Sequence, residues 1–138
     1  MANESVLPLD WIKEAEKDIN QVKIMLSAQD FGDAGFHLQQ AVEKYLKAYL
    51  LAKGWELEKT HDLVKLINYA IKYNPKFEDF VSLCETVTEY YIEERYPFII
   101  KSELTKVEIE ENLERAKTLI NRILDELGLS KKFNRENL

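Results

Sequence analysis

The chain has 138 residues, of which 46% are hydrophobic and 32% are charged, and its formal net charge is −6. A chain of this length can bury the core of one domain without help from disulfides or metals. The acidic balance disfavours broad, non-specific binding to nucleic-acid backbones, but it leaves open a local site for a nucleotide or a short single strand.

Whole-sequence features also suggest where the protein works. The one cysteine, Cys84, cannot form an internal disulfide, which is typical of proteins in a reducing cytoplasm. Residues 1–10 lack the basic and apolar pattern of a signal peptide, and no apolar run is long enough to span a membrane. We therefore expect a cytoplasmic protein with no membrane partner.

Apolar residues at steps of three and four predict helices along most of the chain. The first is expected over residues 9–26, with Pro8 in its first turn, and a turn follows at residues 30–33. The second is expected over residues 33–53. It ends at Gly54, a residue suited to the left-handed conformation after a helix.

The third helix is predicted to begin with Thr60 as its N-cap and to end at the Asn–Pro pair 74–75. The fourth has the cleanest spacing and is expected over residues 77–96, and Thr105 is predicted to cap a fifth that runs to residue 127. The pattern indicates an all-α fold, an antiparallel up-and-down helical bundle of about four long helices plus one shorter helix.

No linker, repeat or low-complexity segment interrupts this pattern, so residues 1–128 are expected to form a single domain. Residues 129–138 contain Lys131, Lys132 and Arg135 and are expected to form a mobile basic tail.

Polar residues gather on one face of the second predicted helix. At 100° per residue, His37, Gln40, Lys44 and Lys47 fall within about a quarter of its circumference. An imidazole, an amide and two ammonium groups in one line could bind phosphate and base edges. The spacing alone favours the plainer alternative, a solvated helix face, with Glu43 and Lys47 four apart as an ordinary surface ion pair.

Two further pairs of polar or aromatic residues could serve either a functional or a purely structural role. His61 and Asp62 are predicted to lie in the first turn of the third helix. There Asp62 suits the helix dipole and His61 could transfer protons near neutral pH, or both could simply cap the helix. Arg95 and Tyr96 could bind a phosphate and stack on a base, or could merely fix how the chain leaves the fourth helix.

Other chemistries find no support in the sequence. Glu58 and His61 have a spacing seen in di-metal bundles, but the pair occurs once and the chain has only two histidines. Cys84 lies on the apolar face of the fourth helix, where we expect a core residue and not a nucleophile. We therefore predict no metal site and no cofactor.

Three segments together resemble a known family. They are residues 36–50 (FHLQQAVEKYLKAYL), residues 60–63 (THDL) and residues 95–97 (RYP), preceded by Trp11 and Asp18. Their order resembles the HEPN (higher eukaryotes and prokaryotes nucleotide-binding) domain family in its small, stand-alone prokaryotic type. The resemblance extends over residues 11–127.

The resemblance implies a helical bundle that forms a homodimer, binds a nucleotide or RNA, and often pairs with a nucleotidyltransferase protein in toxin–antitoxin couples. Ribonuclease members of the family carry an arginine followed four to six residues later by a histidine. Here no histidine follows Arg95, Arg115 or Arg122, so the motif is absent and catalysis is not expected.

Three hypotheses follow, in order. The first is a non-catalytic or weakly catalytic protein that binds a nucleotide or RNA through Lys44, Lys47 and Arg95 on phosphate and through His61 and Tyr96 on base or sugar. The second is an interaction module that pairs with a nucleotidyltransferase. The third is a metal-independent ribonuclease in which His61 and Arg95 are the catalytic residues.

Overall fold

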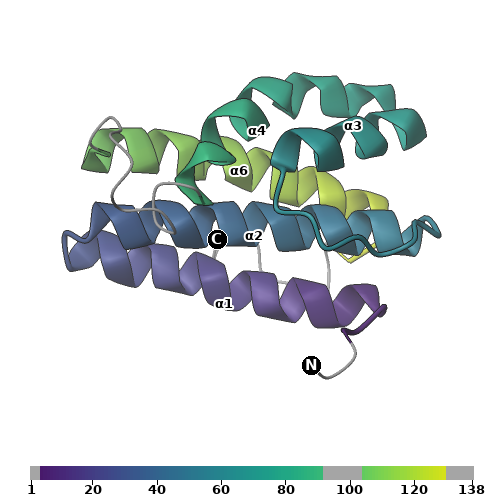
Figure 1. The fold of residues 1–138 in the computed structure, drawn as a ribbon, viewed down its shortest axis with the longest axis horizontal. Coiled ribbons are helices and arrows are strands. Elements are labelled where there is room, and N and C mark those ends of the chain that lie inside the picture. The colour runs from purple at the N-terminus through teal and green to yellow at the C-terminus, as the bar shows by residue number, and fades with distance from the viewer. Residues whose placement is uncertain (1–3, 92–103, 130–138) are drawn as a thin grey trace.

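The computed structural model describes residues 4–91 and 104–129, and within them every regular element is a helix (Figure 1). The helices, labelled as in Figure 1, are α1 Pro8–Ser27, α2 Phe31–Ala52, α3 Leu63–Tyr73, the 3₁₀ helix η1 Pro75–Phe80, α4 Val81–Val87 and α6 Lys106–Glu126. The all-α class is therefore confirmed. Three of these helices are long, with 20, 22 and 21 residues.

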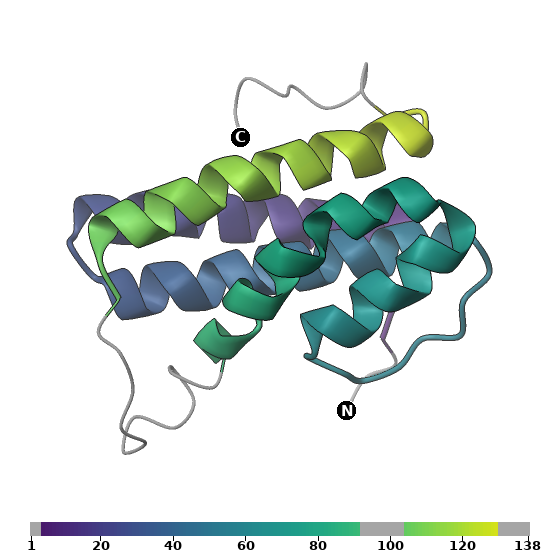
Figure 2. The same ribbon diagram turned by 90° about the horizontal axis from the view of Figure 1, so that it is seen from above.

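Helix α2 lies at the centre of the bundle. Helix α1 runs antiparallel to it on one side, while α3, α4 and α6 cover its other sides (Figures 1 and 2). More than half of the residues of α2 are buried, because neighbours surround it. Among the described residues, no helix combines the length and apolar character needed to cross a membrane.

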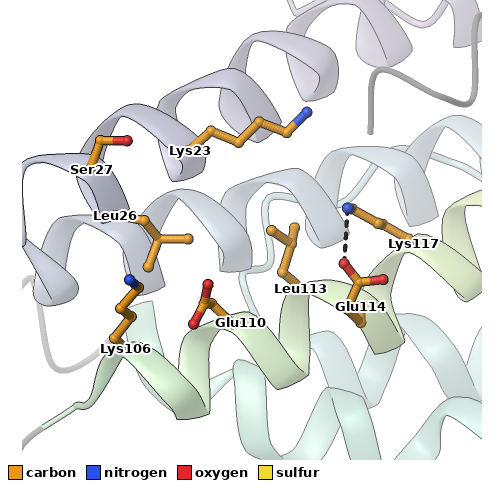
Figure 3. Close-up of a pocket in the computed structure, with 8 residues that line it drawn as sticks. All are labelled: Lys23, Leu26, Ser27, Lys106, Glu110, Leu113, Glu114 and Lys117. Atoms are coloured by element: carbon orange, nitrogen blue, oxygen red, sulfur yellow. Dashed lines mark hydrogen bonds and ion pairs between the residues drawn. The ribbon is translucent and has the colours of Figure 1, made fainter.

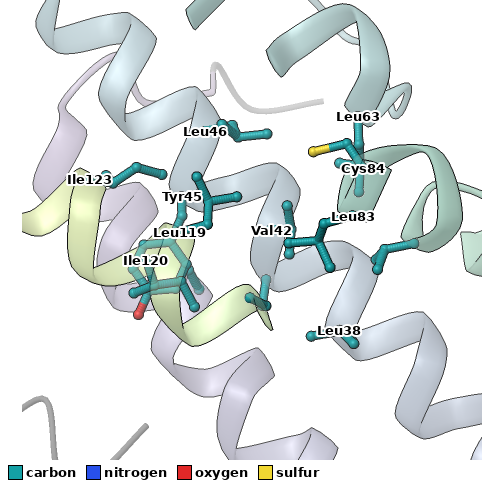
Figure 4. Packing of buried hydrophobic residues seen from close by; sticks show 14 of the residues in the cluster. Leu38, Val42, Tyr45, Leu46, Leu63, Leu83, Cys84, Leu119, Ile120 and Ile123 are labelled. Atoms are coloured by element: carbon teal, nitrogen blue, oxygen red, sulfur yellow. The ribbon is translucent and has the colours of Figure 1, made fainter. Parts of the chain in front are cut away.

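The core forms around α2, where α1 packs on one side and α3, α4 and α6 pack on the others; Figure 4 shows its part towards α3, α4 and α6. Its fully buried side chains come from all of these helices and include Leu38, Val42, Leu46, Leu63, Leu83, Cys84, Leu119, Ile120 and Ile123. Burial raises the pKa of the Cys84 thiol to about 12, so this thiol stays protonated and packs as a small apolar group.

Two helix starts differ from the prediction, and each is set by an aspartate. Helix α2 begins at Phe31, two residues early, because the Asp30 side chain accepts a hydrogen bond from the Asp33 backbone N–H. Helix α3 is capped by Asp62 and not by Thr60, since Asp62 accepts bonds from the N–H groups of the next helical turn. The Thr60 hydroxyl instead accepts from the Asp62 N–H at 3.1 Å.

The described part of the fourth predicted helix is not one continuous helix. Residues 75–80 wind as the 3₁₀ helix η1, whose first residue is proline and whose N-cap is Asn74, and α4 follows. Thr88 interrupts the helical pattern with a turn, and residues 89–91 are helical again. By contrast, the prediction for Thr105 is confirmed, because its hydroxyl accepts the Glu108 N–H at the start of α6.

The far end of α6 is tied to the rest of the bundle by Glu126. Its carboxylate accepts hydrogen bonds from the Tyr49 hydroxyl of α2 at 3.2 Å and from the Asn74 amide at 2.9 Å. Burial and the nearby Glu126 charge raise the pKa of Tyr49 to about 12, which keeps the phenol protonated and able to donate.

Gly35 allows the start of α6 to approach α2 closely. A methyl group at this position would lie 2.9 Å from the Leu104 side chain and 3.3 Å from both Ile109 and Tyr90. The residue is buried and fully helical, so the requirement is for space and not for an unusual backbone conformation.

We expect Gly35→Val to destabilise the fold by about 1–3 kcal/mol, because the added branched side chain must push Leu104 and Ile109 outward. Chemical denaturation measures the change. Ala52→Val is the matched control at the exposed end of the same helix and should change stability by about 0.5 kcal/mol. Equal effects of the two substitutions would show that the contact at Gly35 is not tight.

Candidate functional site

A buried carboxylate on α2 organises the most polar part of the interior. The Glu43 side chain is only 4% exposed, and its oxygens accept from Lys47 Nζ at 3.0 Å, from His61 Nδ1 at 2.9 Å and from Gln39 Nε2 at 3.2 Å. The Lys47 side chain is also 4% exposed, and its ammonium group lies 5.3 Å from the centre of the Trp11 ring. The pair forms as the spacing suggested, but it is buried and not a surface pair.

His61 lies just before α3 and is held at both its ring and its backbone. Its Nδ1–H donates to Glu43, while its backbone carbonyl accepts from Gln39 Nε2 at 3.0 Å and from the Thr88 hydroxyl at 3.4 Å. The Thr88 hydroxyl in turn accepts the Leu63 N–H. Contacts from α2 and from the end of α4 therefore fix this histidine.

The outer part of the His61 ring remains accessible. The side chain is 47% exposed, and among the described residues its Nε2 atom has no hydrogen-bond partner. With Nδ1–H bonded to a carboxylate, a neutral imidazole presents the lone pair of Nε2 to solvent. This is the arrangement in which an imidazole can accept a proton or a hydrogen bond from a ligand.

Aromatic rings continue from His61 into the bundle. The His61 and Tyr91 rings stack with centroids 4.3 Å apart and planes 16° apart, and Tyr91 also stacks on Phe36 at 5.9 Å. These contacts leave the half-exposed imidazole at the solvent end of a row of rings.

A cavity of about 530 Å³ opens beside His61 and Tyr91. Its other walls include Thr88 and the exposed carboxylates of Asp62, Glu85 and Glu89. One oxygen of Asp62 caps α3, and no lysine or arginine of the described residues forms an ion pair with any of these three carboxylates. The cavity therefore combines an aromatic wall with a negatively charged rim.

The other histidine belongs to a second polar cluster, between α1 and α2. Asp18 of α1 accepts from His37 Nδ1 at 2.9 Å with one oxygen and from Lys44 Nζ at 2.6 Å with the other. The His37 and Lys44 side chains are about a quarter exposed. The charge of Lys44 is thus compensated within the fold, as is that of Lys47.

The polar face predicted on α2 is divided because α2 is central. His37 and Lys44 point to α1, Lys47 joins Glu43, and Gln40 is half-buried and donates to the Gln39 amide oxygen at 2.7 Å. None of these side chains lies on a solvated face.

The remaining predicted site residues lie elsewhere. His61 and Asp62 line the cavity, although they precede α3 instead of forming its first turn. Arg95 and Tyr96 lie outside the described residues, as do residues 130–138 of the predicted tail.

Four residues of this region were absent from the predicted site: Gln39, Glu43, Thr88 and Tyr91. For Gln39 and Glu43 the sequence holds a signal, since they precede Lys47 at steps of four and so share one line on the helix. Nothing local signals Thr88 or Tyr91, whose contacts with His61 join segments far apart in the chain. Among the described residues no three acidic, histidine or cysteine side chains gather as a metal site.

A second cavity, of about 540 Å³, runs between α1 and α6 and shares no residue with the first (Figure 3). Its polar lining is mixed in charge, and Lys117 pairs with Glu114 at 3.0 Å. The lining residues are Lys23, Leu26, Ser27, Lys106, Glu110, Leu113, Glu114 and Lys117.

Comparison with known proteins identifies the family. The family model described as "HEPN domain" matches residues 9–127, most of the chain. The chain belongs to the HEPN domain family. Both sets of polar contacts described above lie within the matched residues.

Two relatives of this HEPN protein extend the comparison. It is 28% identical over 128 residues to a protein of Methanocaldococcus jannaschii named "Putative toxin MJ1304", with 83% of this chain and 84% of the relative covered. Its fold is similar to the crystal structure of the protein TT1696 from Thermus thermophilus. The TM-score is 0.72 at 27% identity, with 86% of this chain and 96% of that chain covered.

We expect Glu43→Ala to destabilise the protein by about 3–5 kcal/mol, because the Lys47 ammonium group would stay buried without its partner. Denaturant titration measures the loss. Glu14→Ala is the control, since it removes one half of the exposed Glu14–Lys17 pair and should cost about 0.5 kcal/mol or less. A loss below about 1 kcal/mol for Glu43→Ala would mean that Lys47 reaches solvent easily.

Proposed function

We propose that this HEPN protein binds a nucleotide or single-stranded RNA, as a homodimer, and that a base is bound against His61. The observation that carries the proposal is the half-exposed imidazole, which is oriented by buried Glu43 and stacked on Tyr91 at the wall of a cavity. Unpaired bases bind proteins by stacking on such rings and by hydrogen bonds to their edges.

Two of the three residues predicted to bind phosphate are already paired inside the fold. Lys44 and Lys47 are already paired with Asp18 and Glu43, so using either for phosphate would require breaking an internal ion pair. Arg95 and Tyr96, which follow Tyr91 closely in the chain, remain the predicted phosphate and sugar contacts.

Two roles predicted from the sequence gain less support. His37 is bonded to Asp18 of α1, and Gln40 is bonded to its neighbour Gln39 on α2, so direct contact with a ligand would compete with bonds that these side chains already make. We propose that His37 and Lys44 stabilise the packing of α1 on α2 through Asp18, and that Gln40 orients Gln39.

We expect His61→Ala to weaken binding of short RNA oligomers by about 5- to 150-fold, the loss of one stacked base. Calorimetric titration of nucleoside monophosphates and oligomers against the wild type measures it. Asn68→Ala, exposed on α3 and outside the cavity, is the control and should bind as the wild type does. Unchanged binding by His61→Ala would place the ligand elsewhere.

A ribonuclease is the second candidate function, and the Glu43–His61 pair favours it. A carboxylate that orients an imidazole is a common way to prepare a general base, and His61 would take a proton from the RNA 2′-hydroxyl. The same RNA samples, followed over time by electrophoresis, decide this point. Cleavage that persists in His61→Ala would exclude His61 as the base.

We also propose that the protein works in a toxin–antitoxin pair whose other member is a nucleotidyltransferase. The name of the Methanocaldococcus relative, a putative toxin, supports the toxin–antitoxin part of this proposal. Co-expression with a nucleotidyltransferase encoded beside it should yield a complex that co-purifies, and light scattering should give the mass of a homodimer for the protein alone. A monomeric mass would contradict the homodimer, and a failure to co-purify would contradict the pairing with a nucleotidyltransferase.

A further inference from the structure

The described charges at the rim of the His61 cavity favour a cation over an anion. Asp62, Glu85 and Glu89 all line it with exposed carboxylates, and no cation of the described residues is paired with them. Glu85 and Glu89 are four residues apart in the chain, on either side of the turn at Thr88, and both carry the same charge. Such a rim lowers affinity for an anion and raises it for a cation.

The wall between these carboxylates is aromatic. The His61 ring, backed by Tyr91 at 4.3 Å, is the half-exposed surface of the cavity. A flat cation can stack on such a ring while its edge reaches carboxylates around it. The combination therefore indicates a planar cation with several donors, and a guanidinium group has this shape and five N–H donors.

A metal ion or a lysine fits these groups less well. The described residues do not bring three ligands together as a metal requires. A lysine ammonium is compact and strongly hydrated, so it can approach one carboxylate but gains little from the ring. The size of the cavity, about 530 Å³, exceeds one side chain and leaves room for the neighbouring residues of a polypeptide.

We propose that the His61–Tyr91 cavity receives an arginine side chain of a partner protein. The guanidinium group stacks on the His61 ring and donates to Glu85, Glu89 and Asp62. This occupant covers the imidazole, so it excludes an RNA base from the same surface. The docking of an arginine is inferred from the cavity and its charges alone. The exclusion of RNA rests on the proposed function as well.

The carboxylates should strengthen binding of a guanidinium group and should not strengthen binding of RNA. Replacing Glu85 and Glu89 by glutamine keeps their size but removes two negative charges. Guanidinium binding should weaken by about 3- to 10-fold, the effect of losing two exposed charge pairs. RNA binding should stay the same or tighten by up to about fivefold, because repulsion of phosphate is reduced.

The test is a proton NMR titration with the capped peptide acetyl-Gly-Arg-Gly-amide, whose only charge is the guanidinium group. The chain has two histidines, so the His61 ring signals are assigned by comparison with His37→Gln. The arginine peptide should shift the His61 signals and not those of His37. It should bind more tightly than the equivalent lysine peptide, and it should compete with RNA.

The control for E85Q/E89Q is Glu110→Gln with Glu114→Gln, an exposed pair on α6 with the same spacing and the same change in net charge. It should leave peptide binding unchanged. Lack of a His61 shift, equal binding of both peptides, or equal loss in the control would overturn the docking proposal. If RNA fails to bind while the peptide still shifts His61, the proposed function fails and the docking site stands.

Discussion

The hydrogen-bonded Glu43 carboxylate is the constraint on which the rest of the interior depends. It lies on the central helix α2, almost without solvent, and it accepts from Lys47, His61 and Gln39. A buried carboxylate is tolerated only when such partners compensate its charge. Satisfying Glu43 therefore requires that residue 61 reach back to α2, and this requirement brings the start of α3 against the middle of the bundle.

The same contact creates the accessible surface of the site. Nδ1 of His61 is bonded to Glu43, and the same side chain lines the cavity together with Thr88 and Tyr91. The same imidazole therefore makes a structural hydrogen bond to Glu43 and forms part of the cavity wall. The bond on the buried side of the ring fixes its orientation, and the exposed side is left to contact a ligand. Functional histidines are commonly held in this way.

Apolar spacing predicted the helical class and placed the ends of α1, α2 and α6 within about two residues. It could do so because the repeat of apolar residues in a long amphipathic helix lies within the helix's own sequence. Thr60 and Asp62 are both good caps, so only the folded chain shows that Asp62 begins α3. His37, Lys44 and His61 were predicted as site residues. Their partners Asp18 and Glu43 were not, since helix packing decides which polar groups meet.

Because α2 contacts α1, α3, α4 and α6, more than half of its positions are buried against neighbouring helices. A substitution there must fit against those helices, whereas one on the outer faces of α1 or α6 need satisfy only water. Sequence change within this fold should therefore be slow along α2 and fast along the outer helices. New binding partners would accordingly arise through the outer surfaces, with the central helix kept as a nearly fixed frame.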